Sequence, residues 1–384
     1  MRRANGTRLA FRSEALIAAL LLLCGCTLSN ALRQDDYYSV WNRGSTPART
    51  VFFATDREPS GSDFGLQWGA SLHCGQAAIS IPAVWSSGPV PVKQSQGCDT
   101  GGELARFAAD IAQAAGQQHC GRVLVFVHGA NTTFRTAMMQ GAQLSLDTAW
   151  PCATLVFAWS SEGKFDRYLT DVEHSGFAVP QLTAVLRALA AAGLKTDVIA
   201  HSVGGRLAMS AIGAACGETA ALVDRLLLVA ADVGAEPGND DFGHLLQRDA
   251  ACTGHATLYA SDNDLALITS SGVHGGVPRA GQLFDAHYPG LDVVDATPAL
   301  GDPSGHGYLT LSYEMAGDMM WALAGATPQS RAAPPANTLI CTDWSGGHCA
   351  DGKGHYVLAV APARQPGLGT RLIRRVWPLI LSVE

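Results

Sequence analysis

The chain has 384 residues, of which 47% are hydrophobic and 15% are charged, and its formal net charge is −7. This composition is that of a globular protein with a large core, and it excludes an intrinsically disordered chain. The negative charge argues against a nucleic-acid partner, because nucleic acids are bound by basic surfaces.

The N-terminus has the pattern of an export signal. Four arginines within the first twelve residues precede an apolar stretch, Ala15–Leu23, that is too short to span a bilayer as a helix. The next residues, Cys24-Gly25-Cys26, resemble the end of a bacterial lipobox. We therefore expect residues 1–25 to be a signal peptide and Cys26 to be the lipidated residue, with an uncleaved anchor or an ordinary signal peptide as the alternative. Residues 26–50 would then tether the protein to the membrane of the bacterial cell envelope, most simply the outer membrane on its periplasmic side, or the protein would be secreted.

Strands and helices are expected to alternate through the middle of the chain. Val51–Thr55 is the first predicted strand, and residues 75–92 contain short extended segments broken by prolines. Further apolar runs predict strands at 123–127, 154–158, 197–200, 225–230, 256–260 and 291–294. Helical spacing predicts helices over about 103–115, 133–147 and 170–192, and others that begin near Asp264 and Leu309.

Strands that are apolar throughout and alternate with helices predict an α/β fold with a doubly wound, mostly parallel sheet. In such a sheet the functional site opens at the carboxyl ends of the strands. We expect this domain to cover residues 51–325. A stretch rich in proline and alanine follows, so residues 326–384 are expected to form a linker and a C-terminal extension.

Ser202 lies where one predicted strand ends and a helix begins. Its flanking residues, Ala200-His201-Ser202-Val203-Gly204, match the pattern G-x-S-x-G with alanine in place of the first glycine. This pattern marks a sharp turn that exposes a nucleophilic serine above a parallel sheet. Small residues are required beside the serine because the turn is tight. Ser202 is therefore the predicted nucleophile.

A serine nucleophile needs a histidine base and a carboxylate that orients it. In this fold class the chain order is serine, acid, histidine, with each residue after a strand. His306 follows the last predicted strand in a glycine-flanked loop and is the predicted base. Asp264 is the predicted acid and Asp232 is its main alternative, although either one could cap a helix instead. Weaker candidates are Asp262 as the acid and His274 and His287 as the base.

The loop that follows the strand at 123–127 is expected to form an oxyanion hole. Gly129 allows a close approach of the backbone, so the N–H groups of Ala130 and Val203 are assigned to the hole. His128 and Asn131 are expected to hold this loop, and His201 is expected to be a packing residue. Residues 163–177 and 234–250 would border the pocket, where aromatic side chains could line an acyl site: Trp159, Phe165, Tyr168 and Phe177.

Eight cysteines remain in the mature chain, and an oxidising compartment would allow four disulfides. Cys120 and Cys152 each precede a predicted strand by about the same margin and could lie side by side. Cys74–Cys98 and Cys341–Cys349 would close local loops, which leaves Cys216–Cys252. The connectivity is not fixed by the sequence, and free thiols are the alternative. No spacing typical of a zinc site is present, and we expect neither a metal nor a cofactor.

Six segments, in this order, resemble a bacterial α/β-hydrolase family described as esterase/lipase-like. The segments are Val51–Arg57, Phe126–Phe134, Phe157–Ser161, Ala200–Gly204, Leu258–Asp264 and Gly305-His306. The resemblance covers about residues 51–324 and implies the α/β-hydrolase fold and a serine hydrolase. Two positions depart from the family pattern: Ala130 stands where tyrosine is common, and Ser160-Ser161 replace a turn that usually contains proline.

We therefore expect a serine hydrolase that cleaves carboxylic esters of small molecules or lipids through an acyl-enzyme. An envelope binding or assembly protein that keeps the fold without turnover is one alternative, and it would use residues 338–384 to dock. An acyltransferase or amidase would use the same triad and differ in the acceptor or the bond that is cleaved.

Overall fold

The computed structural model describes residues 48–81, 90–216, 222–236, 241–282, 288–299, 304–343, 349 and 354–360. The expected signal peptide, residues 26–47 of the expected tether with Cys26, and the candidate base His287 lie outside these residues. Arg49 and Thr50, expected in the tether, begin the first strand instead. Within the described ranges, no helix combines the length and the apolar character that a membrane span requires.

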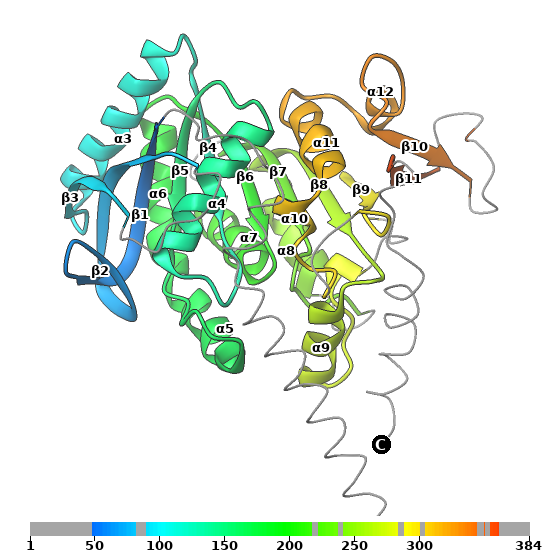
Figure 1. Ribbon diagram of the computed structural model, residues 1–384, viewed down its shortest axis with the longest axis horizontal. Helices are drawn as coiled ribbons and strands as arrows, with labels where there is room; N and C mark the ends of the chain where they lie inside the picture. Colours follow the sequence, from blue (N-terminus) through cyan, green and yellow to red (C-terminus); the bar gives the residue numbers. More distant parts are fainter. Residues whose placement is uncertain are drawn as a thin grey trace, which may run out of the picture.

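One 11-stranded sheet runs through the described residues in the order β10-β11-β9-β8-β7-β6-β4-β5-β1-β2-β3 (Figure 1). The strands from β11 across the sheet to β1 are parallel to one another. The remaining strands are antiparallel to their neighbours, with β10 at one edge and β2 and β3 at the other. This confirms the doubly wound, mostly parallel sheet. The strands are β1 (Arg49–Ser60), β2 (Asp63–Ile79), β3 (Val92–Gly97), β4 (Arg122–Val127), β5 (Ala153–Phe157), β6 (Lys195–His201), β7 (Val223–Val229), β8 (Thr253–Ala260), β9 (Leu291–Asp295), β10 (Leu339–Thr342) and β11 (His355–Leu358).

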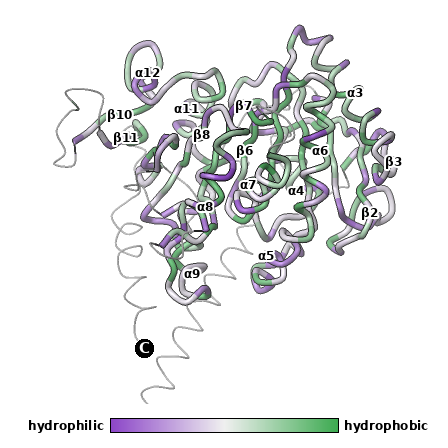
Figure 2. The backbone as a smooth tube through the Cα atoms, turned by 180° about the vertical axis from the view of Figure 1, so that it is seen from behind, coloured by the Kyte–Doolittle hydropathy of each residue, from purple (hydrophilic) through white to green (hydrophobic). Residues whose placement is uncertain are grey.

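Helices cover both faces of the sheet. The helices are α3 (Gly101–Gln117), α4 (Phe134–Asp147), α5 (Tyr168–Phe177), α6 (Val179–Ala191), α7 (Val203–Ala215), α8 (Asp241–Asp249), α9 (Leu265–Val273), α10 (Tyr308–Leu311), α11 (Tyr313–Leu323) and α12 (Pro328–Arg331). Alternate residues of β4 belong to two separate cores: Val125 packs with α3, α6 and α7, and Phe126 packs with α4 and α11. In the view from behind, hydrophobic and hydrophilic residues alternate along the helices, as expected for helices that bury one side (Figure 2).

One predicted element is longer than expected, and another is divided in two. The extended segments expected from residue 75 are part of β2, which begins at Asp63 and forms a long antiparallel hairpin with β1. The single helix expected over 170–192 is divided at Ala178 into α5 and α6. Pro180 explains the division, because proline has no N–H to continue the hydrogen-bond ladder of α5 and is well tolerated in the first turn of α6.

The residues where a linker was expected include the short helix α12, which packs on the main domain. Arg331 in α12 is fully buried and its Nη1 lies 2.5 Å from Asp318 Oδ2 in α11. After it, β10 and β11 pair with each other, and β11 joins the edge of the sheet beside β9. Part of the expected C-terminal extension therefore continues the same sheet.

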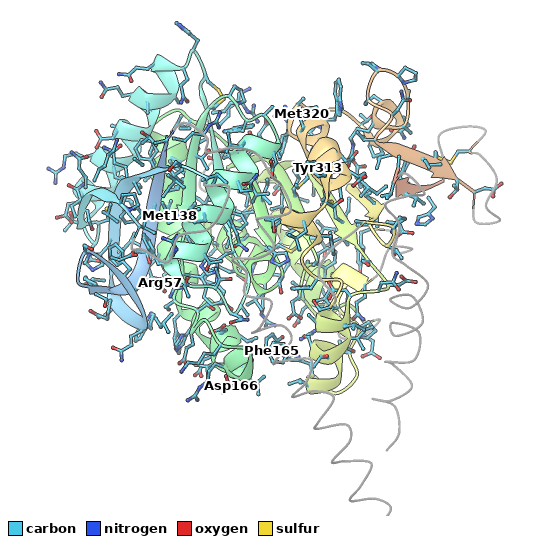
Figure 3. The ribbon with its side chains drawn as sticks, viewed as in Figure 1. Arg57, Met138, Phe165, Asp166, Tyr313 and Met320 are labelled. Carbon is cyan, nitrogen blue, oxygen red and sulfur yellow. A yellow bond between two sulfur atoms is a disulfide. The ribbon has the colours of Figure 1, made fainter. Side chains whose placement is uncertain are left out.

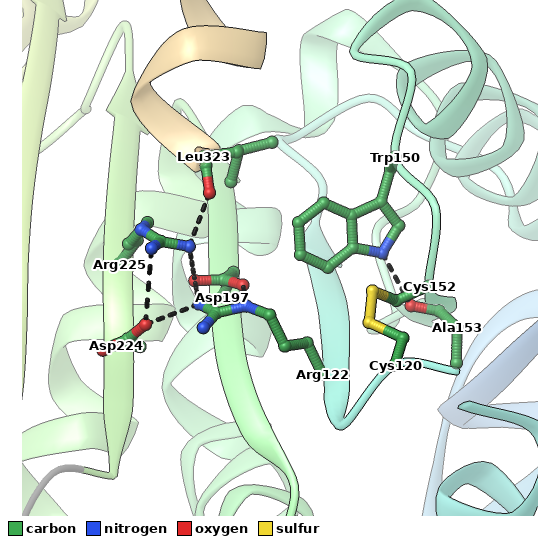
Figure 4. The surroundings of a disulfide bond; sticks show 9 residues. All are labelled: Cys120, Arg122, Trp150, Cys152, Ala153, Asp197, Asp224, Arg225 and Leu323. Atoms are coloured by element: carbon green, nitrogen blue, oxygen red, sulfur yellow. Dashed lines mark hydrogen bonds and ion pairs between the residues drawn. A yellow bond between two sulfur atoms is a disulfide. The ribbon is translucent and has the colours of Figure 1, made fainter. Parts of the chain in front are cut away.

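All four expected disulfides are present: Cys74–Cys98, Cys120–Cys152, Cys216–Cys252 and Cys341–Cys349. Cys120 and Cys152 precede β4 and β5, as the spacing suggested. Figure 4 shows this bond near a group of arginines and aspartates at the amino ends of the central strands, where Arg122 pairs with Asp197 and Asp224. Four disulfides are typical of a protein that folds in an oxidising compartment.

Asp249 at the end of α8 makes folding stability depend on pH. Its side chain is buried, and one carboxylate oxygen has no hydrogen-bond partner. Burial raises the pKa of Asp249 from 3.8 to about 7, against the opposing effect of Arg248. Between about pH 4 and pH 7 the folded state therefore keeps a proton that the unfolded chain has released, so the free energy of unfolding falls as the pH rises through this range.

Replacing Asp249 by Asn is expected to raise the free energy of unfolding at pH 8 by at least about 1 kcal/mol, because the amide is never charged. The gain should shrink as the pH is lowered toward 4. Urea unfolding at several pH values measures it, and Asp110→Asn on the exposed side of α3 is the control. A gain that is equal at pH 4 and pH 8 would contradict the burial argument.

Candidate active site

Ser202 occupies a strained turn between β6 and α7. Its φ of 54° lies in the left-handed region, which is unusual for a residue other than glycine. The backbone is held on both sides: the Ser202 N–H donates to Val229 O at 3.0 Å, and its C=O accepts from the N–H groups of Gly205 and Asp232. The surroundings thus maintain the sharp strand-to-helix turn that the sequence predicts.

Two glycines allow this turn to pack against the end of β4. A Cβ atom on Gly204 would lie 2.3 Å from His128 O, and one on Gly129 would lie 3.0 Å from Ser202 Cβ. Only glycine fits at Gly204 without a shift of the backbone. Ala200, which replaces the first glycine of the pattern, is a buried residue of β6. The turn is therefore pressed against the loop where an oxyanion hole was expected.

His306 and Asp264 form a close pair. His306 Nδ1 lies 2.7 Å from Asp264 Oδ2, and the Asp264 side chain is fully buried. Asp264 is the N-cap of α9, and its other oxygen accepts from Leu267 N–H at 3.0 Å. With Nδ1–H donating to the carboxylate, Nε2 of His306 carries the lone pair that a base requires.

The His306 ring lies close to the turn that carries Ser202. Its centroid is 4.7 Å from that of His201, the residue before Ser202, and His201 Nε2 lies 3.3 Å from His306 O. Burial lowers the pKa of His201 to about 3, with a further contribution from His306. His201 is therefore neutral, and its ring packs against His306 as well as against the turn.

Asp232 lies beside the turn with its carboxylate bound elsewhere. It accepts from Tyr168 Oη at 2.6 Å and Ser270 Oγ at 2.7 Å, and it pairs with Arg279 Nε at 2.9 Å. Burial, followed by the charge of Asp232, raises the pKa of Tyr168. These contacts make Asp232 part of a polar network that joins α5 to α9, whereas Asp264 is the carboxylate placed against His306.

The weaker candidates also have other surroundings. Asp262 is exposed, and His274 Nδ1 lies 2.8 Å from the backbone oxygen of Ser270. Among the four aromatic residues considered for an acyl site, Trp159 is fully buried, while Phe165 and Phe177 are exposed. Phe165 lies near α5, beside Asp166 (Figure 3). Within the described ranges, no group of histidine, cysteine and acidic side chains could hold a metal ion.

The expected oxyanion loop follows β4 and faces the start of α7. Val203 is the first residue of α7, where backbone N–H groups have no partner within the helix. His128 is buried, its ring stacks on Trp159 at 5.0 Å, and burial lowers its pKa to about 3, so it is neutral. Asn131 has a φ of 54°. His128 and Asn131 are thus structural residues of the loop, in line with the role expected for them.

Three residues around this loop were not identified as site residues from the sequence: Arg57, Ser161 and Asp171. Arg57 and Asp171 are fully buried charges. The sequence contains one sign that Arg57 is a site residue, because the two adjacent charges of Asp56 and Arg57 directly follow an apolar strand. Asp171 gave none, since an aspartate in a predicted helix is ordinarily exposed.

One family of known proteins matches the chain, and several solved structures resemble it weakly. The family described as an alpha/beta hydrolase of unknown function (DUF900) matches residues 105–300, and no curated protein matches significantly. Solved structures that resemble the chain include one described as a predicted CIB-like hydrolase from Thermoplasma acidophilum. It has 13% identity and a TM-score of 0.34, and the match covers 74% of this chain and 100% of that chain. An esterase from Rhizomucor miehei has 11% identity, coverages of 77% and 89% and a TM-score of 0.37. An esterase/lipase from an uncultured bacterium has 10% identity, coverages of 75% and 90% and a TM-score of 0.30.

The family match spans just over half of the chain, from α3 past the end of β9, and it includes Ser202 and Asp264. This is the region that carries the strand-to-helix turn and the helices on both faces of the parallel sheet. The chain therefore belongs to this family of α/β hydrolases of unknown function.

Proposed function

We propose that the protein is a serine hydrolase that cleaves carboxylic esters, with Ser202 as nucleophile, His306 as base and Asp264 as the orienting acid. One arrangement carries this proposal. Ser202 stands on a strained turn at the carboxyl end of the sheet, and beside it a histidine donates one ring proton to a buried carboxylate at 2.7 Å. This arrangement supports the proposal, because activation of a serine hydroxyl requires a histidine that is oriented by a carboxylate.

In the proposed reaction, His306 Nε2 takes the hydroxyl proton as Ser202 Oγ attacks the ester carbonyl carbon. The resulting oxyanion faces the N–H groups of Ala130 and Val203. Collapse of the tetrahedral intermediate expels the alcohol, which receives the proton from His306. Water then attacks the acyl-enzyme by the same route and releases the carboxylic acid, while Asp264 stabilises the imidazolium in both steps.

A fluorophosphonate tests the nucleophile, because it phosphonylates an activated serine. The folded protein should take up one equivalent, and the adduct should map to Ser202, which is the only serine in the tryptic peptide 196–206. Urea-denatured protein is the control and should not react. Labelling at another serine, or none, would refute the assignment.

A panel of matched substrates tests the bond that is cleaved. Nitrophenyl esters of increasing acyl length should be hydrolysed, and the corresponding nitroanilides should react far more slowly. Faster turnover of the anilides would point to an amidase. Transfer of the acyl group to an added alcohol in preference to water would point to an acyltransferase.

We further propose that the protein works in the bacterial cell envelope, tethered through Cys26. The four disulfides support export, and the sequence around Cys26 supports lipidation. In a bacterial host, an alkyne fatty acid should label the wild-type chain and leave Cys26→Ser unlabelled and released from the membrane fraction. Equal labelling of both proteins would refute the anchor.

A further inference from the structure

We infer that Asp171 on α5 is a positioning residue for the oxyanion loop, which it holds together with Ser161 and Arg57. The inference rests on the proposed function, since it concerns the residues around Ala130. We define residues 129–132 as the oxyanion loop and Arg57, Ser161 and Asp171 as the clamp.

The orientation of the Ala130 N–H depends on hydrogen bonds to the two peptide groups on either side of Ala130. His128 Nδ1 lies 2.8 Å from Gly129 O and donates to it, and that carbonyl shares a peptide plane with the Ala130 N–H. In a trans peptide the two groups point in opposite directions. Fixing the carbonyl therefore aims the N–H.

The next peptide group is bound at both ends. Its C=O, on Ala130, accepts from Thr132 Oγ1 at 3.0 Å, and its N–H, on Asn131, donates to Asp171 Oδ2 at 2.8 Å. Asn131 has a φ of 54°, a conformation that costs free energy for a residue other than glycine. Asp171 thus binds the strained part of the loop directly.

Asp171 also holds Thr132, the loop residue after Asn131, through Ser161. Ser161 Oγ donates to Asp171 Oδ2 at 2.7 Å and accepts from Thr132 N–H at 2.9 Å, and the other oxygen of Asp171 accepts from Glu162 N–H. Asp171 therefore serves three donors with two oxygens. An amide side chain at this position has one oxygen and two N–H groups, so it cannot accept from all three.

Arg57 closes the clamp from β1. Its side chain is fully buried, and it donates to Thr132 O at 2.7 Å, Ser161 O at 2.9 Å, Ala158 O at 3.2 Å and Gly65 O at 3.1 Å. Burial lowers the pKa of Arg57 to about 10, opposed by Asp56 and Asp171, so the guanidinium stays charged at neutral pH. The arginine ties the oxyanion loop to the segment after β5.

The test is Asp171→Asn, with rates counted per active site by fluorophosphonate titration. Misplacing a donor by a fraction of an ångström weakens transition-state binding more than substrate binding. We expect kcat to fall by about 10- to 100-fold with KM changed by less than about threefold. Affinity for an aliphatic trifluoromethyl ketone, which forms a tetrahedral adduct with the serine, should fall by the same factor as kcat/KM.

Glu173→Gln is the matched control, because Glu173 is exposed on the same helix and the change in charge is the same. It should leave both readouts unchanged. If Asp171→Asn does not fold, Ser161→Ala removes one link of the clamp, and kcat should fall by roughly tenfold.

The outcomes separate the two proposals. A folded variant of the clamp with wild-type kcat per labelled site and wild-type ketone affinity overturns the positioning role while Ser202 labelling still stands. A lower yield of active protein with unchanged kcat per site also overturns it, because that is what a purely structural role predicts. A wild-type protein that is not labelled at Ser202 refutes the proposed function instead.

Discussion

Replacing Asp264 by Asn is expected to lower kcat by about 10⁴-fold, which is the effect of removing the orienting carboxylate from a Ser-His-Asp triad. Asp264 Oδ2 holds Nδ1–H of His306 at 2.7 Å, so the amide would favour the wrong tautomer and would leave the imidazolium without a countercharge. Single-turnover and steady-state kinetics with a nitrophenyl ester measure the loss. The Leu267 N–H can still be capped by the amide oxygen, so α9 should remain intact.

Asp232→Asn is the variant with which Asp264→Asn should be compared. Its carboxylate is paired with the buried Arg279, so the substitution should lower the free energy of unfolding by a few kcal/mol. Per fluorophosphonate-labelled site, kcat should stay within about tenfold of wild type, because the Asp232 carboxylate is bound by Tyr168, Ser270 and Arg279. A larger loss of kcat in Asp232→Asn than in Asp264→Asn would reverse the assignment of the acid.

The sequence could rank these two aspartates only weakly, for a physical reason. Both follow buried strands, and both could cap a helix, so local patterns are nearly the same. What separates them is the partner that each meets in space: Arg279, Tyr168 and Ser270 for Asp232, and His306 for Asp264. Those contacts join segments tens of residues apart, which periodicity and spacing do not encode.

The sequence predicted the structure better where a position tolerates few residue types. Apolar runs predicted the parallel strands of the sheet because both faces are covered, and the cysteines before β4 and β5 were paired because parallel neighbours start at the same edge. The break at Ala178 was missed because the apolar spacing continues through Pro180. Asp171 was missed because its role depends on the loop that it holds, 40 residues away.

Gly204→Ala is the second substitution for which a large effect is expected. The new Cβ would lie 2.3 Å from His128 O and 2.6 Å from Val127 O, which are backbone atoms at the buried end of β4. Neither atom can give way without moving the central sheet, so the start of α7 must move instead. We expect a loss of about 3 kcal/mol in the free energy of unfolding, at the upper end for overpacking. The kcat per labelled site should also fall by about 100-fold, because Val203 moves away from the oxyanion loop.

Gly205→Ala tests whether the effect comes from the contact or from the loss of a glycine in α7. Its Cβ would meet Ala231 Cβ at 3.3 Å, a contact that a small shift relieves, and alanine favours the helix by about 1 kcal/mol. Stability by urea unfolding and kcat should therefore stay close to wild type. If Gly204→Ala behaved like Gly205→Ala, the start of α7 would not be packed tightly against the backbone of Val127 and His128, which directly precedes the oxyanion loop. A severe loss in Gly204→Ala alone would mean that the start of α7 can pack against the backbone before the oxyanion loop only when residue 204 has no Cβ atom.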